Sequence, residues 1–187
     1  PRTAPRKLFA LDVGYSHAVF LQHEGTRAAF QSPGARFTLT WDVNQTVLAF
    51  VQYAHVISVP DDNRDLLRPF QIARVSAGVG IWGGTEDVRF FAQAGLELAF
   101  VITDIEMTQN VNCKHFPSPH PLCAASPVRQ APLLLFGFHM DAGMRWYFAG
   151  DVYALVSVGV GTYWYDAEIS TDLNYPFDGT LAFGSRF

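Results

Sequence analysis

Two neighbouring segments of the sequence alternate between large apolar residues and small or polar ones. In the first segment the apolar positions are Leu134, Phe136, Phe138, Met140, Ala142, Met144 and Trp146, and in the second they are Val152, Ala154, Val156, Val158, Val160, Thr162 and Trp164. A period of two places successive side chains on opposite faces of a β-strand. Each segment is therefore predicted to be a strand with one apolar face, and the function depends on whether that face meets a protein core or a membrane.

The same alternation recurs along the chain. It predicts eight strands, at residues 7–21, 35–43, 46–58, 70–82, 87–103, 131–147, 151–165 and 177–187. The Val-rich runs and interior glycines of these segments disfavour helices. The connections alternate in length, with short ones at 43–45, 83–86 and 148–150 and long ones near 22–34, 59–69, 104–130 and 166–176. We expect a single domain over residues 1–187, because this length suits one core.

Formal charges in the predicted strands fall on one parity. That parity also holds Gly, Ala, Ser and Thr, and its charged members are Asp12, Arg36, Asp42, Arg74, Arg89, Glu97, Asp141, Arg145, Asp178 and Arg186. The opposite parity carries large apolar residues without formal charge. Toward its ends we place Tyr15, Trp41, Trp82, Trp146 and Trp164, because aromatic residues gather where strands cross membrane interfaces. The third strand carries no charge, so the parity that faces inward stays open.

The composition helps to decide which face is outside. Apolar residues make up 49% of the chain and charged residues 16%, where about 25% charged is typical. A soluble lipocalin-like barrel, the alternative, would solvate its polar face with many Lys and Glu, whereas this polar face is poor in Lys. The pattern favours an all-β, eight-stranded antiparallel up-and-down transmembrane β-barrel, apolar outside and polar inside. With a net charge of -4 and no basic cluster, we expect no nucleic-acid partner.

Two cysteines bracket a proline-rich stretch. Cys113 and Cys123 are expected to form a disulfide in an oxidising compartment. The alternative is a metal site made by the same two cysteines with His115 and His120. We favour the disulfide and expect no metal and no other cofactor.

Three stretches resemble a known family: Met144-Arg145-Trp146-Tyr147, Val158-Gly159-Val160-Gly161-Thr162-Tyr163, and Gly179 to Phe187. Together they resemble the small eight-stranded bacterial outer-membrane barrels, the group that includes the membrane domain of outer-membrane protein A. The resemblance spans essentially the whole chain. It implies a place in the bacterial outer membrane among lipid and lipopolysaccharide, with residues 1–6 as a short periplasmic extension and the long loops outside.

The resemblance also implies an assembly signal at the end of the last strand. In that family an aromatic residue preceded by alternating apolar residues is recognised by the barrel-assembly machinery, and the matching residues here are Leu181, Phe183 and Phe187. Ser185 departs from the alternation. We therefore expect the barrel-assembly machinery to be a partner during insertion.

Three functions are compatible with such a barrel. Eight strands enclose an interior just wide enough for side chains, and five acids facing five bases predict a charge-paired, occluded lumen. This favours a membrane anchor, scaffold or surface-binding protein, which meets a protein partner through its external loops or in a membrane complex. The first alternative is a narrow solute or ion channel, which would require the charge pairs to rearrange.

The second alternative is a lipid-modifying outer-membrane enzyme. Nucleophilic catalysis needs a serine, a histidine and an acid within hydrogen-bond reach. The candidates are Ser16 beside His17, His55 near Ser58, and His139 with Asp141. Ser16 and His17 are predicted on opposite faces, and no candidate forms the His-x-Ser pattern of the family's lipid A deacylases. The sequence favours a protein without catalytic activity but leaves the enzyme open.

Overall fold

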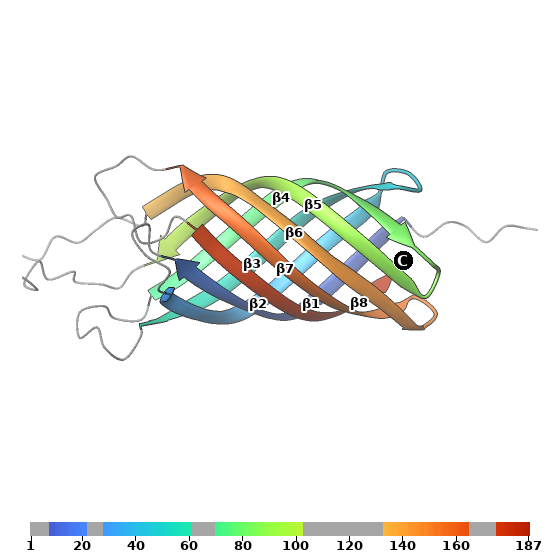
Figure 1. Cartoon of the computed structure of the whole chain (residues 1–187), viewed down its shortest axis with the longest axis horizontal. Coiled ribbons are helices and arrows are strands. Elements are labelled where there is room, and N and C mark those ends of the chain that lie inside the picture. Colours follow the sequence, from blue (N-terminus) through green and yellow to red (C-terminus); the bar gives the residue numbers. More distant parts are fainter. Residues whose placement is uncertain (1–7, 22–27, 61–69, 103–132, 165–174) are drawn as a thin grey trace, which may run out of the picture.

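The chain folds into one closed antiparallel barrel (Figure 1). The computed structural model describes residues 8–21, 28–60, 70–102, 133–164 and 175–187. Its strands are β1 (Phe9–Leu21), β2 (Ala28–Asp42), β3 (Val47–Pro60), β4 (Phe70–Gly84), β5 (Val88–Ile102), β6 (Leu133–Ala149), β7 (Val152–Trp164) and β8 (Tyr175–Arg186). Each strand pairs with its sequence neighbours, and β8 pairs with β1 to close the barrel. The predicted eight-stranded up-and-down barrel is confirmed.

Within the described ranges no helix is long and apolar enough to cross a membrane.

The second strand begins earlier than predicted. We placed a long loop over 22–34, but β2 starts at Ala28 and continues through Pro33 and Gly34. Pro33 and Gly34 lie inside the sheet, where Pro33 is opposite His17 of β1. The β2–β3 register skips Ser32 and Pro33, as expected where proline offers no N–H to a ladder.

Three short turns connect strands at the end of the barrel where the C-terminus lies (Figure 1). The Asn44 side chain accepts hydrogen bonds from the backbone N–H groups of Thr46 and Val47, each at 2.8 Å. Gly84 and Gly150 have φ values of 126° and 62°, a region that favours glycine. Gly83 and Gly84, which we predicted in a turn, are the last residues of β4 instead.

The outer wall of the barrel is apolar. Most of its large apolar side chains expose between 37% and 69% of their surface, with Leu39 at the lower limit and Phe183 at the upper one. No Asp, Glu, Lys or Arg of the described strands points outward, and the predicted charged parity faces inward. A closed wall of this kind leaves no sheet edge unpaired, as a lipid environment requires.

The structure determines which parity of β3 faces inward. Leu48, Phe50, Gln52, Ala54 and Val56 are all buried in the interior. Apolar side chains therefore occupy part of the lumen beside the charges. Leu48 and Phe50 belong to a buried cluster formed by Ala10, Leu48, Phe50, Trp82, Phe91, Tyr147, Tyr153, Leu155 and Ala182.

Trp82 faces this interior, so our prediction that it lies at the membrane interface was wrong. It is 7% exposed, and the Arg89 guanidinium carbon lies 4.3 Å from its ring centroid. Stacking on a cation gives the indole a reason to turn inward. Tyr15, Trp146 and Trp164 do face outward, with more than half of their surface exposed.

Candidate functional site

The barrel interior holds most of the charged residues singled out in the sequence. Seven of the ten are at most 3% exposed: Asp12, Arg36, Arg74, Glu97, Asp141, Arg145 and Asp178. They come from β1, β2, β4, β5, β6 and β8, so only the closed barrel brings them together. Isolated buried charges cost several kcal/mol, on the order of 3–5 when a partner is removed, and these side chains are grouped in three clusters.

The first cluster surrounds Arg74, toward the end of the long connections. Its Nε and Nη2 donate to the two oxygens of Glu97 at 2.9 and 3.1 Å, and Nη1 donates to Asp178 Oδ1 at 2.6 Å. The hydroxyl of Tyr163 donates a further hydrogen bond to Glu97. One guanidinium is thus shared by two carboxylates from β5 and β8.

The second cluster surrounds Arg36. Its Nη1 and Nη2 donate to the two oxygens of Asp141 at 3.1 and 2.9 Å. The hydroxyls of Thr38, Ser157 and Thr180 accept further hydrogen bonds from the same guanidinium, at 3.2–3.4 Å. This bidentate pair joins β2 to β6 through the middle of the lumen.

His139 lies between these two clusters and is 1% exposed. Its Nε2 is 2.9 Å from Asp178 Oδ2, and its Nδ1 is 3.6 Å from Asp141 Oδ2 and 4.0 Å from Glu97 Oε2. Gly159 makes room for this arrangement, since a Cβ there would lie 2.5 Å from Asp141 Oδ1 and 2.8 Å from His139 Nε2. His139 shares its parity with Asp141, so the alternation puts it on the lumen side, but the alternation does not reveal its place between the clusters.

The third cluster lies nearer the short turns. Arg145 Nη2 donates to Thr40 at 2.8 Å and is 3.5 Å from Asp12 Oδ2. Tyr153 donates to the same Asp12 oxygen at 3.2 Å, and its ring centroid is 5.0 Å from the Arg145 guanidinium carbon. Together with the apolar cluster around it, the Arg145 cluster fills the lumen between the Arg36–Asp141 pair and the short turns.

The other three predicted lumen residues, Asp42, Arg89 and Arg186, lie at the rim near the short turns and are only partly buried. Arg186 is 3.7 Å from Asp151 in the last turn and stacks on Tyr147 at 4.3 Å. Among the described residues, three arginines and four carboxylates are at most 3% exposed, so the fully buried part of the network is smaller than the five acids and five bases of the prediction.

Of the candidate catalytic groups, only His139 and Asp141 lie close together, with 3.6 Å between Nδ1 and Oδ2. Ser16 is buried in the lumen, whereas His17 faces outward and its Nδ1 is 2.9 Å from the Tyr15 hydroxyl. His55 also faces outward, with the Tyr53 hydroxyl 3.1 Å from Nδ1 and Gln71 Oε1 3.1 Å from Nε2. Nothing is described of the Ser58 side chain. The described histidines thus lack a serine within reach.

Residues Cys113, His115, His120 and Cys123 all lie outside the described residues. The disulfide therefore stays a prediction.

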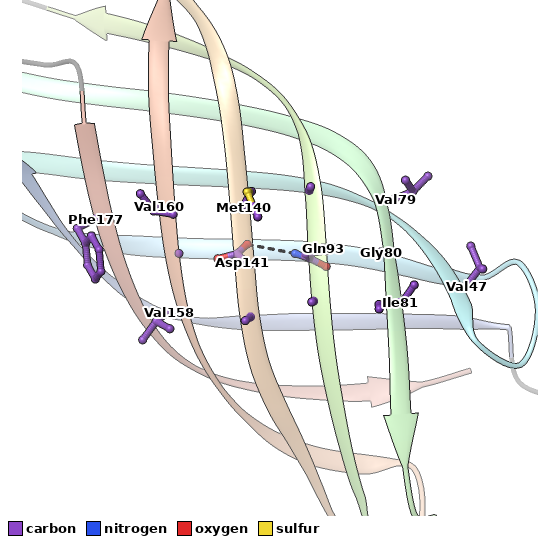
Figure 2. Close-up of a pocket in the computed structure, with 14 residues that line it drawn as sticks. Val47, Val79, Gly80, Ile81, Gln93, Met140, Asp141, Val158, Val160 and Phe177 are labelled. Carbon is purple, nitrogen blue, oxygen red and sulfur yellow. Dashed lines mark hydrogen bonds between the residues drawn. The ribbon is translucent and has the colours of Figure 1, made fainter.

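A shallow apolar pocket of about 610 Å³ lies on the outer wall, with lining residues from β3 to β8. Figure 2 shows Val79, Ile81, Met140, Val158 and Val160 around it. In the same view Gln93 and Asp141, joined by a 3.1 Å hydrogen bond, belong to the lumen network. Ala92, Ala94 and Ala142 also line the pocket between the larger side chains. The pocket offers apolar contact and no reactive group.

The fold is shared with known outer-membrane barrels. Neisserial surface protein A superposes with a TM-score of 0.67 at 12% identity, covering 96% of this chain and 97% of that one. Outer membrane protein OprG of Pseudomonas aeruginosa superposes with a TM-score of 0.60 at 10% identity, covering 96% and 95%. Ail, the attachment invasion locus protein of Yersinia pestis, gives 0.57 at 14% identity, covering 97% and 100%. No protein-family model and no curated protein matches the sequence.

The chain is thus an eight-stranded transmembrane β-barrel with the fold of small outer-membrane proteins. The resemblance that the sequence indicated is confirmed at the level of the fold. At these identities the likeness extends no further than the architecture.

Proposed function

We propose that this chain is an integral barrel of the bacterial outer membrane that serves as an anchor or scaffold. In this proposal the lumen is closed, and the long connections at one end of the barrel bind a partner outside the cell. The observation that carries the proposal is the filled interior. Ion pairs cross the lumen from β2 to β6 and from β4 to β8, and all of their side chains are at most 3% exposed.

The outer wall supports the placement in a membrane. Its apolar side chains suit lipid, and its short turns and long connections lie at opposite ends. The named neighbours are a surface protein, an attachment protein and an outer-membrane protein. In this proposal lipid and lipopolysaccharide surround the wall, and the barrel-assembly machinery inserts the chain.

Planar bilayer recordings test the closed lumen. The purified full chain is expected to give no steady single-channel openings, because moving Arg36 or Arg74 from its carboxylates would expose buried charge. Steady openings of the wild-type protein would contradict the closed anchor and favour the narrow channel.

Photo-crosslinking in native membranes tests the partner. A crosslinking amino acid at Phe116 or Leu122, in the connection between β5 and β6, is expected to give a discrete protein adduct. The matched control is Val158, which faces outward on the wall and is expected to capture lipid. A protein adduct from Val158 alone would instead favour a complex formed within the membrane.

A further inference from the structure

Among the described residues that are at most 3% exposed, the carboxylates outnumber the guanidinium groups by one, and His139 lies between the two clusters that hold this excess. Three guanidinium groups, of Arg36, Arg74 and Arg145, face four carboxylates, of Asp12, Glu97, Asp141 and Asp178, all at most 3% exposed. With a neutral imidazole, this buried set carries one net negative charge. An uncompensated charge in a low-dielectric interior is strongly unfavourable.

The contacts of the imidazole indicate where a proton would go. Nε2 is 2.9 Å from Asp178 Oδ2, so this nitrogen carries hydrogen and donates, because a carboxylate can only accept. If the ring were neutral, Nδ1 would carry no hydrogen and could only accept a hydrogen bond. It would face Asp141 Oδ2 at 3.6 Å and Glu97 Oε2 at 4.0 Å, and no other described group forms a hydrogen bond with it.

We propose that His139 is a proton-binding site that locks the lumen closed. Its imidazolium form is the fourth cation of the interior, and it ties the Arg74 cluster to the Arg36–Asp141 pair. The two clusters then form one continuous plug across β2, β4, β5, β6 and β8. The site exists independently of what the external connections bind.

The surroundings on every strand agree with this assignment. The titratable and charged groups that face the imidazole region are Arg36 on β2, Arg74 on β4, Glu97 on β5, Asp141 on β6, Tyr163 on β7 and Asp178 on β8. The two arginines are already engaged with carboxylates. Asp12 of β1 is engaged with Arg145 and Tyr153, and β3 contributes only the neutral Gln52 among its buried polar residues. The carboxylates around His139 therefore attract an imidazolium. The nearby arginines, which would repel it, are already paired with carboxylates.

Nitrogen-15 NMR of the histidine-labelled full chain, folded in lipid nanodiscs, measures the charge state directly. The His139 signal is assigned by its loss in His139→Gln. Histidine is the side chain that ordinarily changes its charge near neutral pH. At about pH 7 both ring nitrogens of His139 are expected to carry a proton. A bare ring nitrogen at that pH would overturn the proposal. His55→Gln, which changes an outward histidine, is the matched control and is expected to leave the His139 signal unchanged.

Asp178→Asn tests the charge balance. Three carboxylates then face three arginines, so His139 is expected to become neutral at the same pH. If His139 stays protonated in this variant, the excess carboxylate is not the cause of its protonation, and the proposal is overturned.

If Asp178→Asn fails to fold, the stability of the wild type relative to His139→Gln replaces it. Protonation favoured in the folded state stabilises at low pH, and that contribution is lost as pH rises. The denaturant midpoint of the wild type is therefore expected to exceed that of His139→Gln most at acidic pH and to approach it at alkaline pH. A difference that does not vary with pH would contradict the proposal.

Bilayer conductance of the wild type, recorded at the same pH as the NMR spectrum, separates this site from the proposed function. A protonated His139 in a conducting barrel would reject the closed anchor and also the claim that the proton closes the lumen, and would leave only the proton-binding site. A neutral His139 in a silent barrel would reject the proton site alone.

Discussion

The guanidinium of Arg36 and the carboxylate of Asp141 meet across the lumen through two parallel hydrogen bonds, of 3.1 and 2.9 Å, although 105 positions separate them in sequence. Such a fork fixes both the distance and the orientation of the two planes. Strands β2 and β6, which share no edge, are thereby held at a set separation through the interior.

Breaking this pair on one side is expected to destabilise the barrel. Arg36→Met leaves the Asp141 carboxylate buried without its cation, and we expect a loss of about 3–5 kcal/mol in the free energy of unfolding. Asp141→Leu is expected to cost a similar amount. The double variant is expected to lose less than the sum, because neither charge is then left alone.

Reversible denaturation in lipid vesicles measures these free energies. The control is Arg186→Met, which removes a partly exposed rim charge 3.7 Å from Asp151 and is expected to cost less than about 1 kcal/mol. Additive single-variant losses in the double variant would show that the two side chains do not depend on each other.

Gly159 and Gly179 form a matched pair of glycines. At Gly159 an added methyl group would press on Asp141 and His139, whereas at Gly179 nothing lies within 4 Å of the place that a methyl carbon would take. Gly159→Ala is therefore expected to destabilise by about 1–3 kcal/mol through overpacking, and Gly179→Ala to change little. Equal midpoints for the two variants in a denaturant titration would mean that the lumen is looser than these distances indicate.

Quenching of tryptophan fluorescence by brominated lipid is expected to distinguish the outward tryptophans from the inward one. In variants that retain one tryptophan, fluorescence from Trp146 or Trp164 is expected to be quenched by brominated acyl chains, since both expose more than half of their surface outward. Trp82, inside and stacked by Arg89, is expected to be quenched much less. Strong quenching of Trp82 would place its ring in the lipid after all.

The closing strand offers a test of the expected assembly signal. Phe187 stacks on Phe9 with ring centroids 6.1 Å apart, an exposed contact whose loss in Phe187→Ala should cost about 1 kcal/mol or less. If the residue is also recognised during insertion, the amount of folded barrel in cells should fall far more than the purified variant's stability. Pulse-chase labelling with heat-modifiable gel mobility compares the two, and equal small effects would argue against recognition.

The sequence predicts the barrel well wherever a charge marks the inward parity. Asp12, Arg74 and Asp178 each identified the lumen side of its strand. In β3 both parities are apolar, with Phe50 on one and Tyr53 on the other, so hydropathy could not distinguish them. Burial of Phe50 depends on neighbours from other strands, and those follow only from the closed barrel.

The partners of the charges were less predictable than their side. Arg36 reaches Asp141, and Arg74 reaches both Glu97 and Asp178, because the stagger between strands sets which side chains share a level. That stagger is not visible in the alternation. Trp82 was placed outside on the strength of residue type, although its parity with Gly78 and Gly80 already indicated the interior.

The barrel closes only when its last strand, β8, pairs with its first strand, β1. Ala10 is opposite Arg186, and Phe9 and Phe187 exchange backbone hydrogen bonds of 3.2 and 2.9 Å. Until β8 is in place, β1 and β7 each present an unpaired row of backbone groups, which lipid cannot satisfy. A sheet that lacks β8 would therefore have two open edges, and only the pairing of the last strand with the first removes both at once.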